Sequence, residues 1–200
     1  MASKTQAGQL EALAEEIQHL ETSPLYAYRQ EKGYKPVIGE GAPDARIMFI
    51  GEAPGAQEAK SGRPFVGNAG RVLDGLLSSI DLKREDVYIT NVVKDRPPEN
   101  RDPRVDEIAL YSPFLRRQIE IIQPRVIAPL GRFAMDFILE HFGLAEHGQP
   151  IGTLHGVPLD AEAAYGPVTI VPLYHPAAAF YNEELKSVME IDFSVLKQFV

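Results

Sequence analysis

An apolar run that ends abruptly in a loop containing glycine and proline places the strongest constraint on the fold. Residues 46–50 have the length and apolar character of a buried strand. The next five residues, Gly51-Glu52-Ala53-Pro54-Gly55, can neither continue the strand nor begin a regular helix, because proline fixes its own φ and restricts the residue before it. Such a loop, at the carboxyl end of a buried parallel strand, is where open α/β sheets bind ligands. A plain turn without chemistry is the competing interpretation of this segment.

The segment that follows presents one large apolar side chain among small and polar residues. Its sequence is Gly62-Arg63-Pro64-Phe65-Val66-Gly67-Asn68-Ala69-Gly70. Glycine and proline favour irregular backbone, so Phe65 is expected in a loop and not in a helix or strand. A phenylalanine in that position serves either as a hydrophobic plug or as a surface on which a planar ring can stack. The second use favours a ligand-binding loop.

Helical and strand-like patterns alternate along the rest of the chain, which predicts βαβ units and a parallel sheet covered on both faces. The expected fold is a three-layer α/β/α domain with a central four-stranded parallel sheet. Residues 1–200 form one domain, with an N-terminal helix packed on it. Residues 22–45 and 94–104 are expected as loops, and 143–166 as a loop with a possible short hairpin. Strands are predicted at 46–50, 87–93, 125–130 and 168–173, and helices at 5–21, 68–79, 104–122, 131–142 and 183–199.

Composition excludes several classes of protein. The chain has no cysteine, so disulfides, thiolate nucleophiles and cysteine-ligated clusters are excluded. Its five histidines show no i,i+4 pair of the kind that binds metal on a helix, and no metal or other cofactor is expected. Neither a leader-like apolar segment nor a run of bilayer length is present, which predicts a cytoplasmic protein with no membrane partner.

Charge is distributed unevenly around a net value of −8. Residues 60–132 contain 13 Lys and Arg against 10 Asp and Glu, so the acidic excess lies outside this section. The section either presents a basic face to an anionic partner or forms an ordinary mixed surface.

Polar residues follow three of the predicted strands. The loop Gly51–Gly55 follows the first, Asn91 the second, and His175 the fourth. Carboxyl ends of parallel strands meet at one edge, so these residues and Phe65 are expected to share a pocket. Taken singly, Asn91 could close a turn and His175 could be a hydrogen-bonded structural histidine. Together, an amide, an imidazole and a flat apolar ring suit a nucleobase with an imide edge.

Several ordered motifs resemble the uracil-DNA glycosylase superfamily, most closely its family 4, between about Pro24 and Tyr181. The motifs are Gly51-Glu52-Ala53-Pro54-Gly55, Gly62-Arg63-Pro64-Phe65-Val66-Gly67, Thr90-Asn91-Val92-Val93-Lys94, Arg96-Pro97-Pro98 followed by Asn100-Arg101-Asp102-Pro103, and His175-Pro176. Their number, order and spacing make the resemblance specific.

The resemblance implies a role for each matching residue. Phe65 would stack on a uracil flipped out of DNA, and Asn91 would read its O4 and N3–H edge. His175 would hydrogen-bond O2, with the backbone amides of Glu52 and Ala53 beside it. Gly51, Gly55 and Glu58 complete the expected substrate-binding set, and His175, Glu52 and Asn91 form the catalytic set. DNA contacts are expected from Arg63, Asn68, Lys94, Arg96, Arg101, Pro176, Ala178 and Phe180.

Three features qualify the resemblance to family 4. Its four cluster-binding cysteines correspond here to Leu20, Ser23, Asp95 and Tyr111, so an iron–sulfur cluster is not expected, and packing and polar contacts should replace it. Ala53 occupies the position at which another branch has an aspartate that activates water, as in family 4. Either Glu52 or Glu58 then activates water, or the enzyme needs little assistance from a base. The sequence Ala177-Ala178-Ala179-Phe180 replaces a Ser-Pro-Leu wedge, so Phe180 or Tyr181 is the candidate to fill the vacated stack.

Three functions are compatible with these residues. The first is a metal-independent, monomeric DNA repair enzyme that hydrolyses the N-glycosidic bond of uracil in single- or double-stranded DNA. The second is a protein that binds uracil in DNA without turnover or becomes covalently trapped, although loop 95–104 contains no histidine of the kind that traps substrate in a related branch. The third is a nucleotide-binding module unrelated to DNA.

Overall fold

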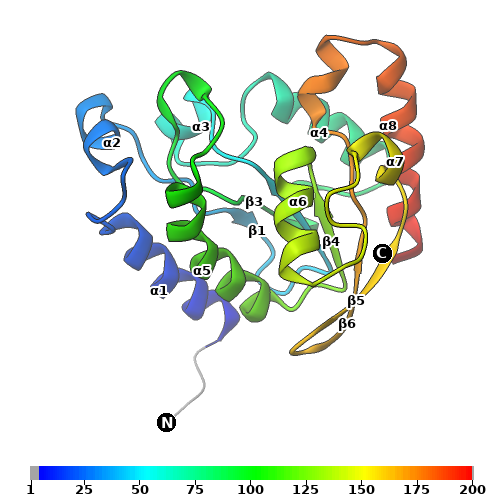
Figure 1. Cartoon of the computed structure of the whole chain (residues 1–200), viewed down its shortest axis with the longest axis horizontal. Coiled ribbons are helices and arrows are strands. Elements are labelled where there is room, and N and C mark those ends of the chain that lie inside the picture. Colours follow the sequence, from blue (N-terminus) through cyan, green and yellow to red (C-terminus); the bar gives the residue numbers. More distant parts are fainter. Residues whose placement is uncertain (1–4, 200) are drawn as a thin grey trace.

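The computed structural model describes residues 5–199, in which helices cover both faces of one central sheet (Figure 1). Six strands form the sheet in the order β1-β3-β2-β4-β6-β5. The four inner strands are parallel: β3 (Tyr88–Asn91), β2 (Ile47–Gly51), β4 (Val126–Pro129) and β6 (Gly166–Ile170). The predicted three-layer α/β/α class with its four parallel strands is therefore confirmed.

Two antiparallel edge strands were not predicted as such. Strand β1 (Glu40–Gly41) pairs with β3, and β5 (Leu159–Ala163) forms a hairpin with β6. Strand β1 is too short to show a periodic pattern. The alternation of half-buried and exposed residues along β5 fits a strand with one solvated face. A short hairpin was one alternative for residues 143–166, and the structure contains a hairpin that begins there and is formed by β5 and β6.

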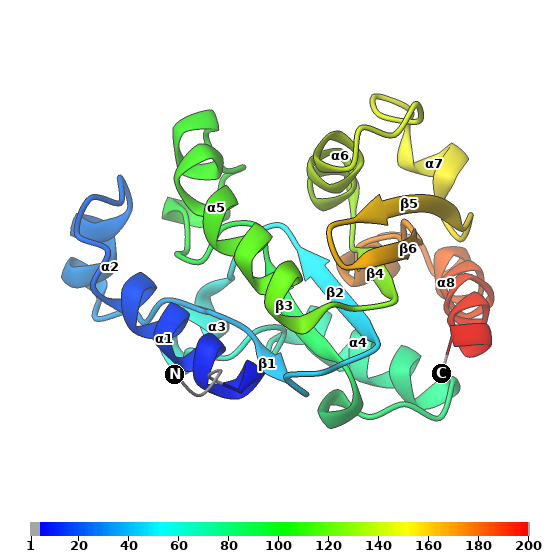
Figure 2. The same ribbon diagram turned by 90° about the horizontal axis from the view of Figure 1, so that it is seen from below.

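Helices cover one face of the sheet (Figure 2). These are α1 (Gln6–Gln18), which packs on α5 (Val105–Ile122), and α6 (Arg132–His141). Because side chains alternate along a strand, Met48 and Ile50 of β2 meet these helices in one core cluster. Leu13 and Ile17 lie one turn apart on α1 and are fully buried in the same cluster, which docks α1 on the sheet layer.

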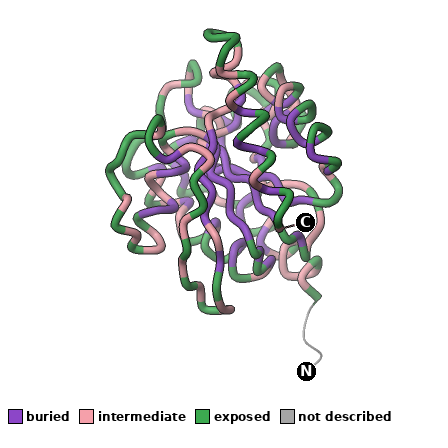
Figure 3. The backbone as a smooth tube through the Cα atoms, turned by 90° about the vertical axis from the view of Figure 1, so that its right-hand side faces the viewer, coloured by how far each residue is buried: buried purple, intermediate pink, exposed green. Residues whose placement is uncertain are grey.

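The opposite face carries α4 (Asn68–Ser79) and α8 (Glu184–Ser194), which continues into the 3₁₀ helix η4 (Val195–Phe199). The alternate residues of β2, Ile47 and Phe49, enter this second cluster, and Phe49 stacks on Phe193 with ring centroids 5.7 Å apart. Figure 3 shows the buried strands enclosed between these two layers. The sheet is therefore apolar on both faces, and its polar chemistry is confined to the strand ends.

Local predictions differ from the structure mainly in the short elements, among them α3 (Ala56–Ser61), for which no helix was predicted. The predicted loop 22–45 contains α2 (Tyr26–Lys32) as well as β1, and 143–166 contains α7 (Ile151–Leu154). Asn68 is the first residue of α4, and Gly67 takes the N-cap position. Val105 is 84% exposed because it lies at the first helical position of α5. Short 3₁₀ helices lie at η1 (Arg84–Asp86), η2 (Pro98–Asn100) and η3 (Pro176–Phe180).

A buried polar network occupies the region in which the resembled family carries its cysteines. The Tyr111 hydroxyl donates to Asp95 Oδ2 at 2.7 Å and lies 2.9 Å from Ser23 Oγ. Arg29 Nη1 donates to Asp95 Oδ1 at 3.2 Å, and its Nη2 donates to a main-chain carbonyl of α1 at 3.0 Å. Leu20, the fourth position, packs half-buried against the core. This network ties α1 and α2 to the loop after β3.

Candidate active site

A cavity of about 450 Å³ opens at the carboxyl edge of the parallel strands. Gly51 at the end of β2 pairs in register with Asn91 at the end of β3. The chain after β6 reaches the same edge, because Leu173 bridges Leu130 and precedes His175 by two residues. Of the predicted substrate-binding residues, seven line the cavity: Glu52, Ala53, Gly55, Glu58, Phe65, Asn91 and His175.

Gly51 lies at the point where the amide and the ring come together. A Cβ atom at this position would overlap Asn91 Oδ1 and would lie only 2.7 Å from Cζ of Phe65. Any side chain at position 51 would therefore displace both groups. Gly51 does not itself line the cavity, and the structure gives it a steric role beneath the pocket.

Phe65 is held in a strained backbone conformation. Its φ is +50°, in the left-handed region that non-glycine residues rarely occupy. Glu58 stabilises the following turn, since its Oε1 accepts hydrogen bonds from the main-chain N–H groups of Val66 at 2.9 Å and Gly67 at 2.8 Å. Gly70 lies against the main-chain carbonyl of Phe65 so closely that a Cβ atom could not fit. Glu58, predicted to bind substrate, thus also positions the aromatic wall.

Arg84 is a supporting residue that the sequence analysis did not single out. Its Nη1 donates to the main-chain oxygen of Phe65 at 3.0 Å, and its Nη2 donates to that of Pro64. Its Nε donates to Glu40 at 2.7 Å, and Nη1 also reaches Asp74 at 2.9 Å. The guanidinium group therefore fixes the Phe65 loop to the edge of the sheet. Arginine at this place follows no local motif.

His175 faces Phe65 across the cavity, with ring centroids 5.7 Å apart and planes inclined by 35°. Its Nδ1 accepts a hydrogen bond from the main-chain N–H of Ala177 at 3.2 Å. This contact requires a lone pair on Nδ1, so the ring proton of the neutral form resides on Nε2. Burial lowers the pKa of His175 from its ordinary value, which favours the neutral imidazole at pH 7. Nε2–H is thus available as a neutral donor to a ligand.

Glu52, in the loop after β2, is half-buried and lines the cavity. Burial raises its pKa to about 7, nearby Asp102 adds to the rise, and Arg132 opposes it. Among the hydrogen bonds of residues 5–199, none involves its carboxylate, whereas its main-chain oxygen accepts from Val93 N–H at 3.0 Å. A half-buried carboxyl group with a pKa near neutrality can exchange a proton with water or substrate.

The basic residues predicted to contact DNA are mostly engaged with protein groups. Lys94 is fully buried, so the prediction that it contacts DNA is wrong. Arg63 Nε donates to Glu40 at 2.7 Å, and Arg101 Nη1 donates to Glu107 at 2.9 Å. Arg96 donates to the Tyr34 hydroxyl at 2.6 Å. The predicted basic face is therefore a set of ion pairs and hydrogen bonds, with Arg101 alone of these arginines lining the cavity.

None of the remaining residues predicted to contact DNA lines the cavity itself. Asn68 is exposed and accepts a hydrogen bond from Arg71 at 2.9 Å, while Pro176 is buried and Ala178 half-buried. Phe180 is 53% exposed and points into a separate groove between α4 and α8. Tyr181, the alternative wedge residue, is 90% exposed and lines the cavity itself. Of the two aromatic residues, Tyr181 is therefore better placed beside a bound base.

The residues at the four cysteine-equivalent positions do not fit an iron–sulfur cluster. They supply an alkyl group, a hydroxyl, a carboxylate and a phenol, and the three polar groups are already bonded to one another. Within residues 5–199, no group of three or more histidine, aspartate or glutamate side chains is arranged to hold a metal ion. No helix in that range is both long and apolar enough to cross a membrane.

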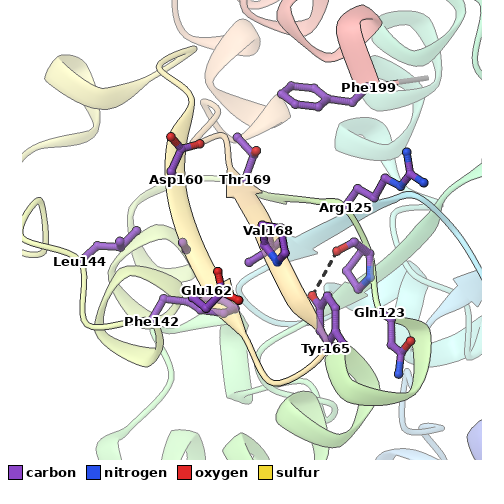
Figure 4. A pocket seen from close by; sticks show the side chains of 13 residues that line it. Gln123, Arg125, Phe142, Leu144, Asp160, Glu162, Tyr165, Val168, Thr169 and Phe199 are labelled. Atoms are coloured by element: carbon purple, nitrogen blue, oxygen red, sulfur yellow. Dashed lines mark hydrogen bonds between the residues drawn. The ribbon is translucent and has the colours of Figure 1, made fainter.

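A larger hollow lies at the opposite edge of the sheet, at the amino ends of β4 and β6 (Figure 4). Arg125, Tyr165 and Asp160 border it, and the Tyr165 hydroxyl donates to the main-chain oxygen of Pro124 at 3.1 Å. It is broad and contains neither an unpaired buried group nor any of the predicted site residues. We therefore assign the chemistry to the smaller cavity.

Comparison with known proteins shows the family of the chain. The sequence profile of the uracil DNA glycosylase superfamily matches residues 38–194. The chain is 43% identical over 190 residues to a type-4 uracil-DNA glycosylase of Sulfurisphaera tokodaii, a match that covers 94% of this chain and 84% of the relative. It is 39% identical over 193 residues to the type-4 enzyme of Thermotoga maritima, covering 96% and 94% of the two chains. A type-5 enzyme of Thermus thermophilus is 35% identical over 140 residues, covering 62% and 64%.

Proposed function

The chain belongs to the uracil-DNA glycosylase superfamily, and from this premise we propose that it excises uracil from DNA by hydrolysis of the N-glycosidic bond. The observation that carries the proposal is the convergence of Asn91, Phe65 and His175 on one cavity of about 450 Å³. A single flipped pyrimidine needs a flat apolar wall, an edge reader and a donor to its carbonyl oxygen. Those three requirements are met by side chains from three separate segments.

Asn91 is proposed to select the base. A carboxamide presents one donor and one acceptor side by side, the complement of the O4 and N3–H edge of uracil. Cytosine has an exocyclic amine in place of O4 and an unprotonated N3, so its pattern is reversed. Asn91 is 2% exposed, and its side chain is packed between Gly51 and the cavity, where it can face the edge of a bound base.

His175 and Glu52 are proposed to carry the chemistry. Breaking the glycosidic bond leaves an oxocarbenium-like sugar and a base that departs with negative charge. The neutral Nε2–H of His175 would donate to uracil O2 as that charge develops, with the backbone amides of Glu52 and Ala53 near the same oxygen. The Glu52 carboxylate would then accept a proton from the water that attacks the sugar carbon. No metal or other cofactor takes part in these steps.

The proposal extends to the partner and the setting of the reaction. Tyr181, at the cavity mouth, is proposed to occupy the vacated stack, and Arg101 and Arg96 are proposed to meet the DNA backbone. One domain is proposed to carry the activity, because α1 shares its buried core with α5 and the sheet. We propose a monomer acting on single- or double-stranded uracil-containing DNA in the cytoplasm, associated with the nucleoid.

The test is excision from an oligonucleotide with one uracil. The product abasic site is cleaved by alkali, so release appears as a shortened strand. Both strand states should be assayed, with thymine and hypoxanthine in place of uracil as controls. Shortened strands from uracil substrates are expected. No cleavage of either substrate at high enzyme concentration would overturn the proposal, and an adduct that survives denaturation would instead favour the covalently trapped binder.

The pH dependence of excision should report Glu52. If the carboxylate is the active form, the excision rate rises with pH and levels off above about 7, the pKa that burial gives this group. In Glu52→Gln the rise of the excision rate with pH is expected to disappear, which leaves a lower rate that hardly depends on pH. The same variant should unfold at higher temperature than wild type at pH 8 but not at pH 4, because a raised native pKa destabilises the ionised native state. A Glu52→Gln variant whose excision rate still rises with pH as in wild type would exclude Glu52 as the titrating base.

Replacement of Asn91 by aspartate should change base preference. A carboxylate offers acceptors only, so it repels uracil O4 and can accept from the cytosine amine. We expect Asn91→Asp to lose most uracil excision and to gain measurable release of cytosine. The measurement is the ratio of excision rates on matched uracil- and cytosine-containing strands. An unchanged ratio would remove Asn91 from base reading.

A further inference from the structure

Lys94 differs from every other buried charged residue that the structure describes. Five charged side chains are buried between residues 5 and 199, and four of them lie within ion-pair distance of a partner. Arg29 and Asp95 pair with each other, Glu107 pairs with Arg101, and Asp192 pairs with His155. Lys94 has no acidic partner in that part of the chain. Burying an uncompensated charge is costly, and proteins seldom do so without a use for the charge.

Three neutral oxygen atoms surround the Lys94 side chain. Its Nζ lies 2.8 Å from Thr90 Oγ1, 2.6 Å from Gln118 Oε1 and 2.6 Å from the main-chain oxygen of Asn91. The Thr90 hydroxyl donates its proton to Ile38 O at 2.6 Å, so it offers Lys94 only a lone pair. Gln118 Nε2 donates to the same carbonyl at 3.0 Å, which turns its Oε1 toward Lys94.

This arrangement favours the protonated amine. All three neighbours act as acceptors toward Nζ, and only an ammonium group has three hydrogens to donate. A neutral amine has only two hydrogens, so its nitrogen lone pair would face a lone pair of the third oxygen atom. Burial by itself lowers the pKa of Lys94 well below its usual range, and the three acceptors oppose that effect. The site is thus built to hold a positive charge.

The ammonium group lies next to Asn91, the residue proposed to read the base. Lys94 Nζ donates to the main-chain oxygen of Asn91, whose side chain lines the cavity. In a water-poor interior a charge acts over a longer distance than in solution. We propose that the Lys94 ammonium group is a counter-charge for the uracil that leaves as an anion, and thereby an electrostatic and positioning residue for excision. The inference rests on the proposed function.

Removal of the charge should slow uracil release in a manner that depends on the leaving base. Lys94→Met keeps the length of the side chain and removes the ammonium group. We expect the single-turnover rate on uracil-containing DNA to fall about 10- to 30-fold, less than for a direct donor, because the ammonium acts from behind Asn91. 5-Fluorouracil leaves as a more stable anion, since fluorine withdraws electrons, so its release should fall by a distinctly smaller factor.

A second variant tests the same charge without removing the lysine. Gln118→Glu places a carboxylate at the Oε1 position beside Nζ and leaves the contact to Asn91 in place. It should also slow uracil more than 5-fluorouracil, with an unchanged KM. Lys83→Met, at a side chain that is 76% exposed, is the matched control and should retain wild-type rates. Thermal unfolding identifies the folded variants, and Gln118→Glu decides the matter if Lys94→Met does not fold.

The outcomes separate this inference from the proposed function. If wild type releases no uracil, the proposed function itself fails. If wild type is active and the folded variants either match its rate or lose equal factors on both bases, the Lys94 inference fails alone. Unequal factors, larger on uracil, support it.

Discussion

Replacement of His175 by alanine is expected to lower the uracil excision rate by a factor of about 10² to 10³, the usual effect of removing one pre-oriented donor to a developing anion. The donor is pre-oriented because Ala177 N–H occupies Nδ1 and leaves the proton on Nε2. The loss should fall on the chemical step and not on DNA binding, since His175 donates most strongly when the base becomes anionic. Single-turnover rates and substrate affinity, measured together, distinguish the two.

Two variants make the His175 test specific. His175→Gln retains an N–H donor of similar reach and should recover part of the lost rate. His147→Ala changes an exposed histidine outside the cavity and should behave as wild type. A His175→Ala enzyme that excises uracil within threefold of wild type, while folded, would exclude the proposed role.

Asp95→Ala is expected to have the largest effect on stability. Asp95 is 1% exposed and accepts hydrogen bonds from Tyr111 and Arg29. Its removal leaves the buried Arg29 guanidinium uncompensated, and breaking a buried ion pair in this way typically costs about 3–5 kcal/mol. Urea unfolding should show a free energy of unfolding lower by that amount, or no folded protein at 37 °C.

The matched controls separate charge from packing. Asp160→Ala removes an exposed carboxylate on β5 and should change the free energy of unfolding by less than about 0.5 kcal/mol. The double variant Asp95→Leu with Arg29→Met removes both charges and should recover part of the lost stability, because apolar replacements of a buried pair are often neutral. If Asp95→Ala unfolds at the wild-type urea concentration, the network does not hold α1 and α2 in place.

Much of the site could be predicted because topology places it. Gly51, Asn91 and His175 each follow an apolar run that predicts a strand. The carboxyl ends of parallel strands meet at one edge of the sheet, so these residues were expected to lie together. The helices were predictable for a similar reason, since their apolar residues recur at helical spacing over long segments. Short elements such as β1 and α7 were missed because two to four residues cannot show a period.

The supporting residues could not be predicted from local sequence. Lys94 follows two valines in a polar loop and resembles a surface residue, and only Gln118, 24 positions later, and Thr90 reveal its burial. Arg84 reaches the Phe65 loop from 19 residues away. Such long-range contacts carry no periodic signal, and a charge count over residues 60–132 cannot show that Glu40 and Glu107 neutralise its arginines.

The strained turn at Phe65 has a consequence for how damaged DNA is found. Because Glu58, Arg84 and Gly70 hold this residue before any DNA arrives, the conformational entropy of ordering the pocket is already spent during folding. We therefore expect the slow event in capture to be the spontaneous opening of the target pair and not a rearrangement of the enzyme. Sites in which uracil is weakly paired, as opposite guanine or beside a nick, should therefore be captured faster than sites opposite adenine in a stable duplex.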